Sequence, residues 1–302
     1  MTKLICTHSG SFHADDALGV AMLMTLFPSA EVVRSRDPDV WAKADILVDV
    51  GGEHDVSRAR FDHHQKGFDR KRPCGTPYAG AGLVWDAYGK DYVSLLVPEL
   101  TDAERDEVFC RVDALLVRHA DAFDSGIEVG GPFEFGLAGI INGFNNTWAE
   151  SDSDDDRFNL AWTVAGMTLR NLTVAQAAQV RANSIVRDAE CLFDGRLLVL
   201  DRARLPYDEY VVSHMPRVLF AVYPESRGEQ YQVRVIPQVI GQFKARADLP
   251  AAWAGLRDKE LAAVTGVADA VFCHNGRFIA GASSKEGALA LAKLAIEALA
   301  GD

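Results

Sequence analysis

Short apolar runs that end in histidine or aspartate dominate the first 64 residues. Residues 46–48 (Ile-Leu-Val) precede Asp49 and a Gly-Gly pair, and residues 4–6 (Leu-Ile-Cys) lead to His8. An apolar run of this length, bounded by turn residues, is typical of a strand buried on both faces of a parallel sheet. Open α/β sheets place their sites at the carboxyl ends of such strands. We therefore expect His8 and Asp49 to belong to one site.

The same stretch is dense in residue types that bind metals. It holds five of the chain's eight histidines, His8, His13, His54, His63 and His64, and between them lie Asp15, Asp16, Asp49 and Asp62. A single histidine is usually a polar surface residue or a satisfied core residue, but this density at predicted strand ends predicts a metal site. Imidazole with carboxylate suits Mn, Fe, Co or Zn, and the carboxylate content favours Mn over a closed structural zinc site.

The order of the predicted elements indicates an α/β fold. Residues 15–27 form an apolar helix that opens with two acids, as helix N-termini prefer. Further strands are predicted at 31–35 and 45–50, and further helices at 79–88 and 102–120. The N-terminal domain should therefore contain a mostly parallel sheet flanked by helices.

A second, smaller α/β domain follows a long helix at 157–192. Its predicted strands are residues 197–200, 217–222, 231–236, 271–274 and 278–279, and its closing helix is 286–300. We place the boundary near residue 195, which gives a catalytic domain at 1–195, including the connecting helix, and a substrate-facing domain at 196–302. The acidic run at 145–156 is typical of a solvated loop. Read as a calcium loop, it lacks the glycine and the terminal glutamate of an EF-hand, and Ser153 or Asp154 should cap the helix.

Composition limits the classes of function. A net charge of −12 over 302 residues argues against indiscriminate duplex binding, which needs Lys and Arg to neutralise phosphates. It does not exclude a nuclease whose metal ions supply positive charge. Five scattered cysteines without a CxxC pair indicate a reduced, intracellular protein. The chain lacks an 18-residue apolar stretch and a basic targeting segment, so we expect a cytoplasmic protein without a membrane partner.

Three motifs carry a family resemblance: Thr7-His-Ser-Gly-Ser-Phe-His-Ala-Asp15, Val48-Asp-Val-Gly-Gly52 and Phe61-Asp-His-His-Gln65. Asp62-His63-His64 resembles the triplet that names the DHH phosphoesterase superfamily. The ordered set is similar to the melanocyte-proliferating-gene family of metal-dependent hydrolases, in its bacterial form. The similarity continues at 121–126, 250–258 and 285–289, and so spans nearly the whole chain. The triplet alone recurs by chance, whereas the ordered set is specific.

This resemblance implies a site with two divalent ions. Its implied metal ligands are His8, His13, Asp15, Asp49, His63 and Asp124. Asp49 would bridge the ions, Asp62 would orient His63, and His64 would meet the phosphate, so Asp62 and His64 are the catalytic candidates. Asp121 would support a ligand, although it or Asp124 could simply cap a helix or turn. His13 stands where the superfamily usually has aspartate, which favours softer ions.

The residues expected to bind the phosphate of the substrate depart from the superfamily pattern. Many DHH phosphoesterases carry Gly-Gly-His in the smaller domain, where this chain has Ala280-Gly281-Ala282-Ser283. Ser283 can donate one hydrogen bond but carries no charge. The other candidates to hold phosphate are Arg36, Arg234, Lys244 and Arg246.

Together these features predict a metal-dependent phosphoesterase that activates water with two ions roughly 3.5–4 Å apart. The resemblance implies a 3'-5' type exonuclease or an oligonucleotide phosphodiesterase, acting on RNA or single-stranded DNA. The alternatives are a small-molecule phosphatase or pyrophosphatase, and a non-catalytic metal-binding protein. The intact ligand set argues against the last. The sequence leaves open the metal, the cleavage polarity and the oligomeric state, and it is compatible with a homo-oligomer.

Overall fold

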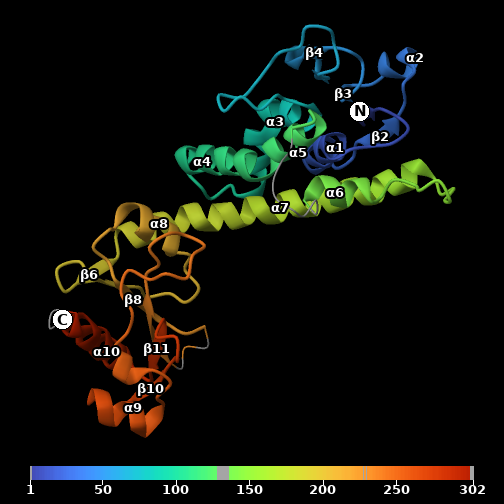
Figure 1. The fold of residues 1–302 in the computed structure, drawn as a ribbon. Helices are drawn as coiled ribbons and strands as arrows, with labels where there is room; N and C mark the ends of the chain where they lie inside the picture. The colour runs from blue at the N-terminus through green and yellow to red at the C-terminus, as the bar shows by residue number, and fades with distance from the viewer. Residues whose placement is uncertain (1, 128–135, 227, 229, 300–302) are drawn as a thin grey trace. The chain divides into compact units, whose positions relative to one another are not determined.

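The computed structural model describes residues 2–127, 136–226, 228 and 230–299 (Figure 1). The chain forms two compact units, Met1–Val180 and Arg181–Asp302. The division falls inside the long helix α7 (Asp154–Arg187), somewhat before the boundary expected near residue 195. Each unit contains its own sheet, and the α/β fold class expected from the sequence is confirmed.

The first unit contains a five-stranded sheet in the strand order β2-β1-β3-β5-β4. Its strands are β1 (Leu4–Thr7), β2 (Glu31–Arg34), β3 (Ile46–Val48), β4 (His54–Asp55) and β5 (Arg60–Phe61). Parallel pairing joins β1 to β2 and β3, and β3 to β5, while β4 is an antiparallel edge strand. The carboxyl ends of β1, β3 and β5 therefore meet at one edge of the sheet.

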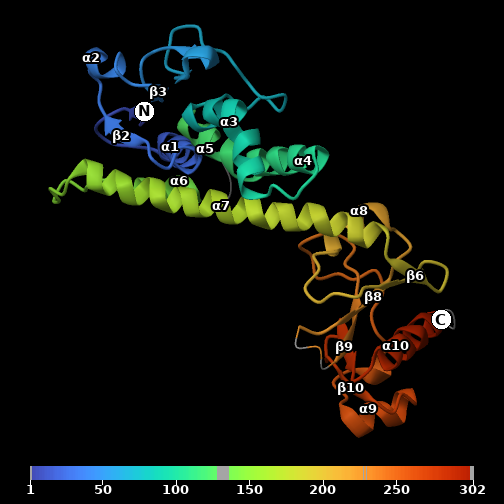
Figure 2. The same ribbon diagram turned by 180° about the vertical axis from the view of Figure 1, so that it is seen from behind.

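The inner strands β1 and β3 are buried on both faces, which explains their continuous apolar runs. Ile5, Ile46 and Val48 face the main core, which includes α1 (Ala14–Leu26) and α3 (Gly80–Leu96). Cys6 and Leu47 face a smaller cluster on the other side, next to α2 (Pro38–Trp41). Helices α1 and α3 pack against each other on one side of the sheet in both views (Figures 1 and 2).

The segment predicted as one helix at 102–120 is longer and contains an irregular turn. Helix α4 (Asp102–Val112) leads into a π-helical turn (Asp113–Val117) and then into α5 (Arg118–Asp124). Asp124 is thus the last helical residue rather than part of the following loop, and Gly126, at φ 70°, makes the expected turn. A π turn shifts the register of the helix after it and is frequent at functional sites.

Two more helices complete the first unit. Helix α6 (Leu137–Asn142) is short, and α7 begins where Ser153 Oγ accepts from the backbone N–H of Asp156, as a capping side chain does. The buried side chains Phe158, Ala165 and Leu169 of α7 belong to the main core of this unit. The helix ends at Arg187 rather than at the expected residue 192, since β6 begins at Glu190.

A six-stranded sheet in the order β10-β11-β9-β8-β7-β6 forms the second unit. Its strands are β6 (Glu190–Leu192), β7 (Leu197–Val199), β8 (Phe220–Pro224), β9 (Tyr231–Val235), β10 (Ala270–Cys273) and β11 (Ile279–Ala282). All neighbours are antiparallel except β7 and β8. The helices are α8 (Asp208–His214), α9 (Asp258–Thr265) and α10 (Lys285–Ala298), with α10 packed on β8, β9 and β11.

Across the described ranges, no helix combines the length and the apolar character needed to cross a membrane.

Candidate metal centre

The carboxyl ends of three neighbouring strands deliver most of the candidate ligands. His8 follows β1, Asp49 follows β3, and Asp62-His63-His64 follows β5. Asp49 has a φ of 55°, and Gly51 and Gly52 continue with φ values of 102° and 67°. Aspartate tolerates this left-handed region better than most side chains, and glycine adopts it freely. The chain can therefore turn sharply at the strand end and leave the Asp49 carboxylate at the sheet edge.

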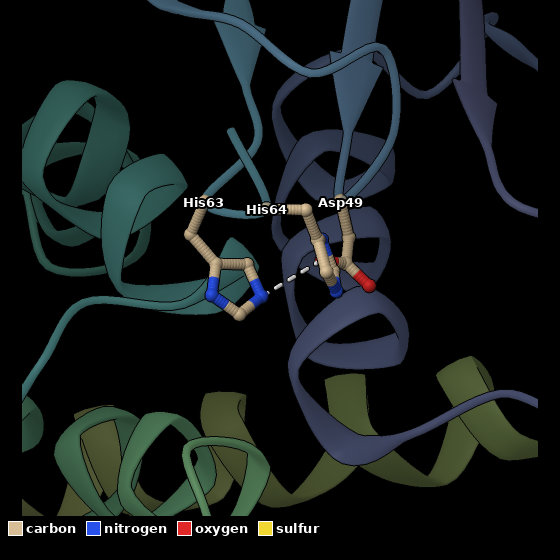
Figure 3. Close-up of side chains that lie close together, drawn as sticks. All are labelled: Asp49, His63 and His64. Atoms are coloured by element: carbon tan, nitrogen blue, oxygen red, sulfur yellow. Dashed lines mark ion pairs between the residues drawn. The ribbon is translucent and has the colours of Figure 1, made fainter. Parts of the chain in front are cut away.

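Asp49, His63 and His64 form a first group of possible ligands (Figure 3). His63 Nε2 lies 3.1 Å from Asp49 Oδ1, and His64 Nδ1 lies 3.4 Å from the same oxygen. The three ligand atoms of this group all lie within 4.8 Å of one another, which is close enough to share a cation.

His13, Asp15 and Asp124 form a second group. His13 precedes α1, Asp15 lies in its first turn, and Asp124 ends α5, with His13 Nδ1 at 3.7 Å from Asp124 Oδ1. The two groups are connected, because His63 Nε2 lies 3.2 Å from Asp124 Oδ2. Five of the six expected ligands thus fall into two adjacent groups of the type that binds two ions.

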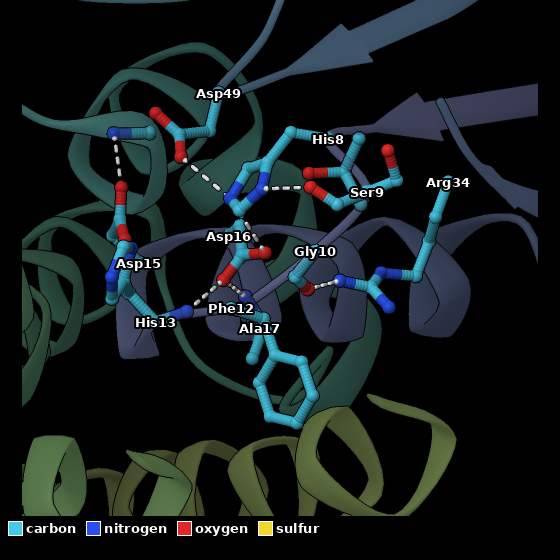
Figure 4. Close-up of polar contacts among 12 residues, drawn as sticks. His8, Ser9, Gly10, Phe12, His13, Asp15, Asp16, Ala17, Arg34 and Asp49 are labelled. Carbon is cyan, nitrogen blue, oxygen red and sulfur yellow. Dashed lines mark hydrogen bonds and ion pairs between the residues drawn. The ribbon is translucent and has the colours of Figure 1, made fainter. Parts of the chain in front are cut away.

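The sixth, His8, contacts Asp49 and Asp16 (Figure 4). His8 Nε2 lies 3.3 Å from Asp49 Oδ2 and 3.2 Å from Asp16 Oδ2. Asp16 was not among the expected site residues. Its Oδ1 accepts from the backbone N–H groups of His13 and Ala17, so it also holds the start of α1. An acid three residues after a helix N-cap was the available signal for this role.

Three buried polar atoms of the two ligand groups make no hydrogen bond among the described residues, although two of them, Asp49 Oδ1 and His63 Nε2, lie 3.1 Å apart as an ion pair. The third is Asp15 Oδ1. Burying such atoms without a partner is costly, and native proteins rarely do so without a reason. All three are good ligands for Mn, Fe, Co or Zn, so the residues present fit a divalent cation.

Electrostatics in the metal-free chain agrees with this fit. Burial raises the pKa of Asp15 well above its usual value, and the charges of Asp49 and Asp124 raise it further. Burial alone would lower the pKa of His63, but its contacts with Asp124 and Asp49 raise it to about 10. The carboxylates therefore draw protons into the cluster. A cation would replace those protons, because imidazole and carboxylate bind metals in their deprotonated forms.

Asp62 has a different partner from the one expected. Its Oδ1 lies 2.8 Å from His64 Nδ1, and its Oδ2 accepts from Gly52 N at 2.5 Å. Within the described residues Asp62 makes no such contact with His63, so the expectation that it orients His63 is corrected: it orients His64. The His64 side chain is 62% exposed, and its Nδ1 is held by Asp62.

Two glycines at the start of α3 allow a close approach that the sequence reasoning did not anticipate. A Cβ at Gly80 would lie 3.0 Å from Asp49 Cβ, and a Cβ at Gly82 would overlap Asp121 Oδ2. The backbone N–H groups of Gly80 and Gly82 donate to Asp15 and Asp121, respectively. Asp121 is fully buried and lies in neither ligand group, as expected for a supporting residue. The Gly-Ala-Gly spacing at a helix start was the sequence signal.

The candidate phosphate-binding residues are divided between the units. Arg36 belongs to the first, where its Nη2 lies 3.1 Å from His8 Nδ1 and its Nε donates to Ser9 O. It therefore lies at the rim of the cluster.

The other candidates lie in the second unit, and their approach to the cluster stays a prediction. Lys244 and Ser283 are exposed, and Arg234 Nη2 lies 3.6 Å from Asp208 Oδ2. Arg246 is engaged in structural contacts, since its guanidinium donates to four backbone carbonyls in the last turn of α8 and in the segment just after it: Val211, Val212, Met215 and Val218.

The fold and the cluster define an α/β protein of the Asp-His-His type. A family model, MYG1_exonuc, described as "Uncharacterised protein family (UPF0160)", matches residues 4–296. MYG1 protein C27H6.8 of Caenorhabditis elegans is 33% identical, over 98% of this chain and 96% of its own length. MYG1 exonuclease of Rattus norvegicus is 32% identical, over 96% of this chain and 83% of its own length. The chain belongs to the MYG1 family; its bacterial type stays a prediction.

A solved structure described as an exopolyphosphatase-related protein from Bacteroides fragilis also matches. It is 11% identical, covers 98% of this chain and 92% of its own, and has a TM-score of 0.22. A superposition of that quality adds nothing to the assignment.

Proposed function

We propose that this chain is a metal-dependent phosphoesterase that hydrolyses RNA or single-stranded DNA oligonucleotides as an exonuclease. The observation that carries the proposal is the pair of connected ligand groups, in which buried carboxylate and imidazole atoms lack hydrogen-bond partners among the described residues. Relatives named MYG1 exonuclease, 31–32% identical to the chain, support the choice of substrate.

Two divalent ions would be held by the two ligand groups. His13, Asp15 and Asp124 would hold one, and Asp49 and His63 the other. Asp49 is our candidate for a ligand shared by both ions, because its charge also acts on Asp15. When bound, the ions would activate a water molecule and offset the charge of the phosphate. Manganese is our first choice, because carboxylates make up half of the two groups.

His64 would act on the substrate. The hydrogen bond with Asp62 raises the pKa of His64, which favours the protonated form of the ring. A protonated ring held at Nδ1 can donate from Nε2 to a phosphate oxygen, or give a proton to the leaving oxygen. Asp62 fixes the orientation of the ring, because its other oxygen is anchored to the backbone of Gly52.

A small-molecule phosphatase or pyrophosphatase is the second candidate, because the same ligand groups suit it. The net charge of −12 favours a short substrate, since a longer polyanion is repelled by more of the surface.

Metal analysis followed by a hydrolysis screen tests the proposal. The purified chain is analysed for Mn, Fe, Co and Zn, and is then supplied with each ion and with end-labelled RNA, end-labelled single-stranded DNA or pyrophosphate. We expect two ions per chain and stepwise shortening of an oligonucleotide. Asp49→Ala should abolish both, whereas Asp69→Ala, which changes an exposed carboxylate outside the two ligand groups, should retain both. Cleavage of pyrophosphate alone would favour the second candidate, and a chain that binds no divalent ion would contradict both.

A further inference from the structure

Arg72 is a buried cation behind the second ligand group. Its side chain is only 3% exposed, although it lies in the irregular segment between the Asp-His-His triplet and α3. Its Nη1 donates to Asp121 Oδ2 at 2.7 Å, and its Nη2 donates to Asp113 Oδ1 at 2.7 Å. The Nε of Arg72 donates to the same Asp113 carboxylate. Such a two-pronged contact fixes orientation as well as charge.

Asp121 connects this cation to a candidate ligand. It lies on α5 three residues before Asp124, so the two side chains are about one helical turn apart. Its other oxygen accepts from Gly82 N at 2.9 Å. Burial raises the pKa of Asp121 to about 7, against the opposing charge of Arg72. Arg72 therefore helps to keep a carboxylate ionised where water does not reach it.

The two acidic partners of Arg72 lie on either side of an irregular helical turn. Asp113 begins the π-helical turn, which ends at Val117, and Asp121 lies in the regular helix that follows. A π turn changes the rotation of the helix after it relative to the helix before it. A side chain that binds both ends of this turn limits how α5 can rotate. That rotation sets the position of the Asp124 carboxylate at the end of α5.

Backbone N–H groups in the first turn of α3 hold the carboxylates of the second ligand group in place. Gly80 N donates to Asp15 Oδ2 at 3.1 Å, which leaves Asp15 Oδ1 as the unpartnered oxygen of that carboxylate. Gly82 N, two residues later, holds Asp121. Both carboxylates of the second ligand group are thus tied to one helical turn, Asp15 directly and Asp124 through Asp121.

We propose that Arg72 is the positioning residue of the second metal site, His13-Asp15-Asp124, and that it acts by clamping Asp113 and Asp121 across the π turn. The inference rests on the proposed function in that it assumes divalent ions at the cluster. It adds that the two ions depend on different parts of the chain. Loosening the clamp releases the ion at Asp124 and spares the ion at Asp49 and His63, which are delivered by strand ends.

Titration of metal-free protein with Mn²⁺ tests this inference without relying on activity. Isothermal calorimetry, with electron paramagnetic resonance to count free Mn²⁺, should find two ions in the unchanged chain. In Arg72→Met and Arg72→Lys one ion should bind as before, and the other about 10–100-fold more weakly, the range found when a residue that supports a metal ligand is lost. Asp113→Asn, which keeps Arg72 beside Asp121 but weakens the clamp, should show the same selective loss to a smaller degree.

Arg70→Met is the matched control. Arg70 lies in the same segment, contacts Asp86 at 2.6 Å, and stacks on the Tyr78 ring, as Arg72 does. It contacts neither Asp113 nor Asp121 in the described structure, so both ions should bind to Arg70→Met as in the unchanged chain. Thermal melting of the metal-free variants identifies a misfolded one. If Arg72→Met does not fold, Arg72→Lys and Asp113→Asn carry the test, because both keep a cation beside Asp121.

The remaining outcomes of the titration either overturn or support the inference. If the folded variants bind both ions with unchanged affinity, or lose both equally, Arg72 only stabilises the fold and the inference is overturned. If the unchanged chain itself binds no Mn²⁺, Fe²⁺, Co²⁺ or Zn²⁺, the proposed function fails, and the inference that depends on it fails too. A selective loss of one ion in the Arg72 variants supports both.

Discussion

His63 Nε2 lies 3.2 Å from Asp124 Oδ2, which joins the end of a strand to the end of a helix. The same nitrogen lies 3.1 Å from Asp49 Oδ1, so His63 stands between the two ligand groups. Which ligand is replaced should therefore decide which ion is lost, and the metal content of single variants measures this.

Metal content should fall differently in two ligand variants. Asp49→Ala should lose most of both ions, because Asp49 is the candidate ligand for both: its Oδ1 lies 3.1 Å from His63 Nε2, and its charge also acts on Asp15 of the second group. Asp124→Asn should lose one ion and keep the other. Elemental analysis of the purified variants measures this directly. Full occupancy in Asp49→Ala would show that Asp49 does not bridge.

His64→Ala should retain its metal and lose turnover. The ring is exposed and is held by Asp62, so its position suits the substrate better than a buried ion. We expect kcat to fall by roughly 10²–10⁴, the range typical of a positioned acid–base group. Metal analysis and steady-state kinetics on the same preparation separate the two roles. Loss of metal in His64→Ala, with retention in His63→Ala, would reverse the assignment of the two histidines.

Arg36→Ala should weaken substrate binding more than it slows turnover. Arg36 lies beside His8 at the rim of the cluster, where a cation can meet a phosphate next to the scissile one. We expect a higher KM for oligonucleotide and a weaker dependence of KM on salt. Arg234→Ala, in the second unit, should act in the same direction on long substrates only. Unchanged KM and salt response in both variants would assign these arginines to ordinary surface.

Arg246→Ala should lower stability rather than affinity. Its guanidinium donates to the carbonyls of Val211 and Val212 in the last turn of α8, which need donors, and to those of Met215 and Val218 just after the helix at 2.7 and 2.8 Å. A charged hydrogen bond of this kind is worth about 1.5–3 kcal/mol when buried, and this side chain is partly exposed, so we expect a loss of about 1–2 kcal/mol. Urea unfolding measures it. A raised KM with unchanged stability would instead restore Arg246 to the phosphate-binding set.

Cys74 should be the fastest cysteine to react with iodoacetamide near neutral pH. Its contacts with Thr76, and then with Arg118, lower the pKa of the exposed thiol to about 7. Because the thiolate is the reactive form, the rate should rise with pH through about 7 and then level off. In Thr76→Val the rise should move to higher pH. Peptide mapping by mass spectrometry, with Cys74→Ser as the control, identifies the site. A rise at the same pH in Thr76→Val would exclude the contact as the cause.

The alternation of elements could be predicted because its signals are local. Apolar runs at 4–6 and 46–48 indicated strands buried on both faces, and those strands occur as β1 and β3. The order of the motifs indicated the family, since each motif occupies a few consecutive residues. The length of the helix at 102–124 was underestimated, because a π turn leaves no periodic signal of its own.

The sequence by itself supplied the candidate metal ligands, because imidazole and carboxylate are side chains that bind divalent ions and they cluster in a few short motifs. Only the tertiary structure decided how they divide. In the structure His63 contacts both Asp49 and Asp124, Asp62 contacts His64, and Arg72 donates to Asp121. Apart from the Asp62–His64 contact, these pairings join segments far apart in the chain, and they depend on helix rotation and on the space left by Gly80 and Gly82. No local pattern encodes such distances, because they arise only when separate elements pack together.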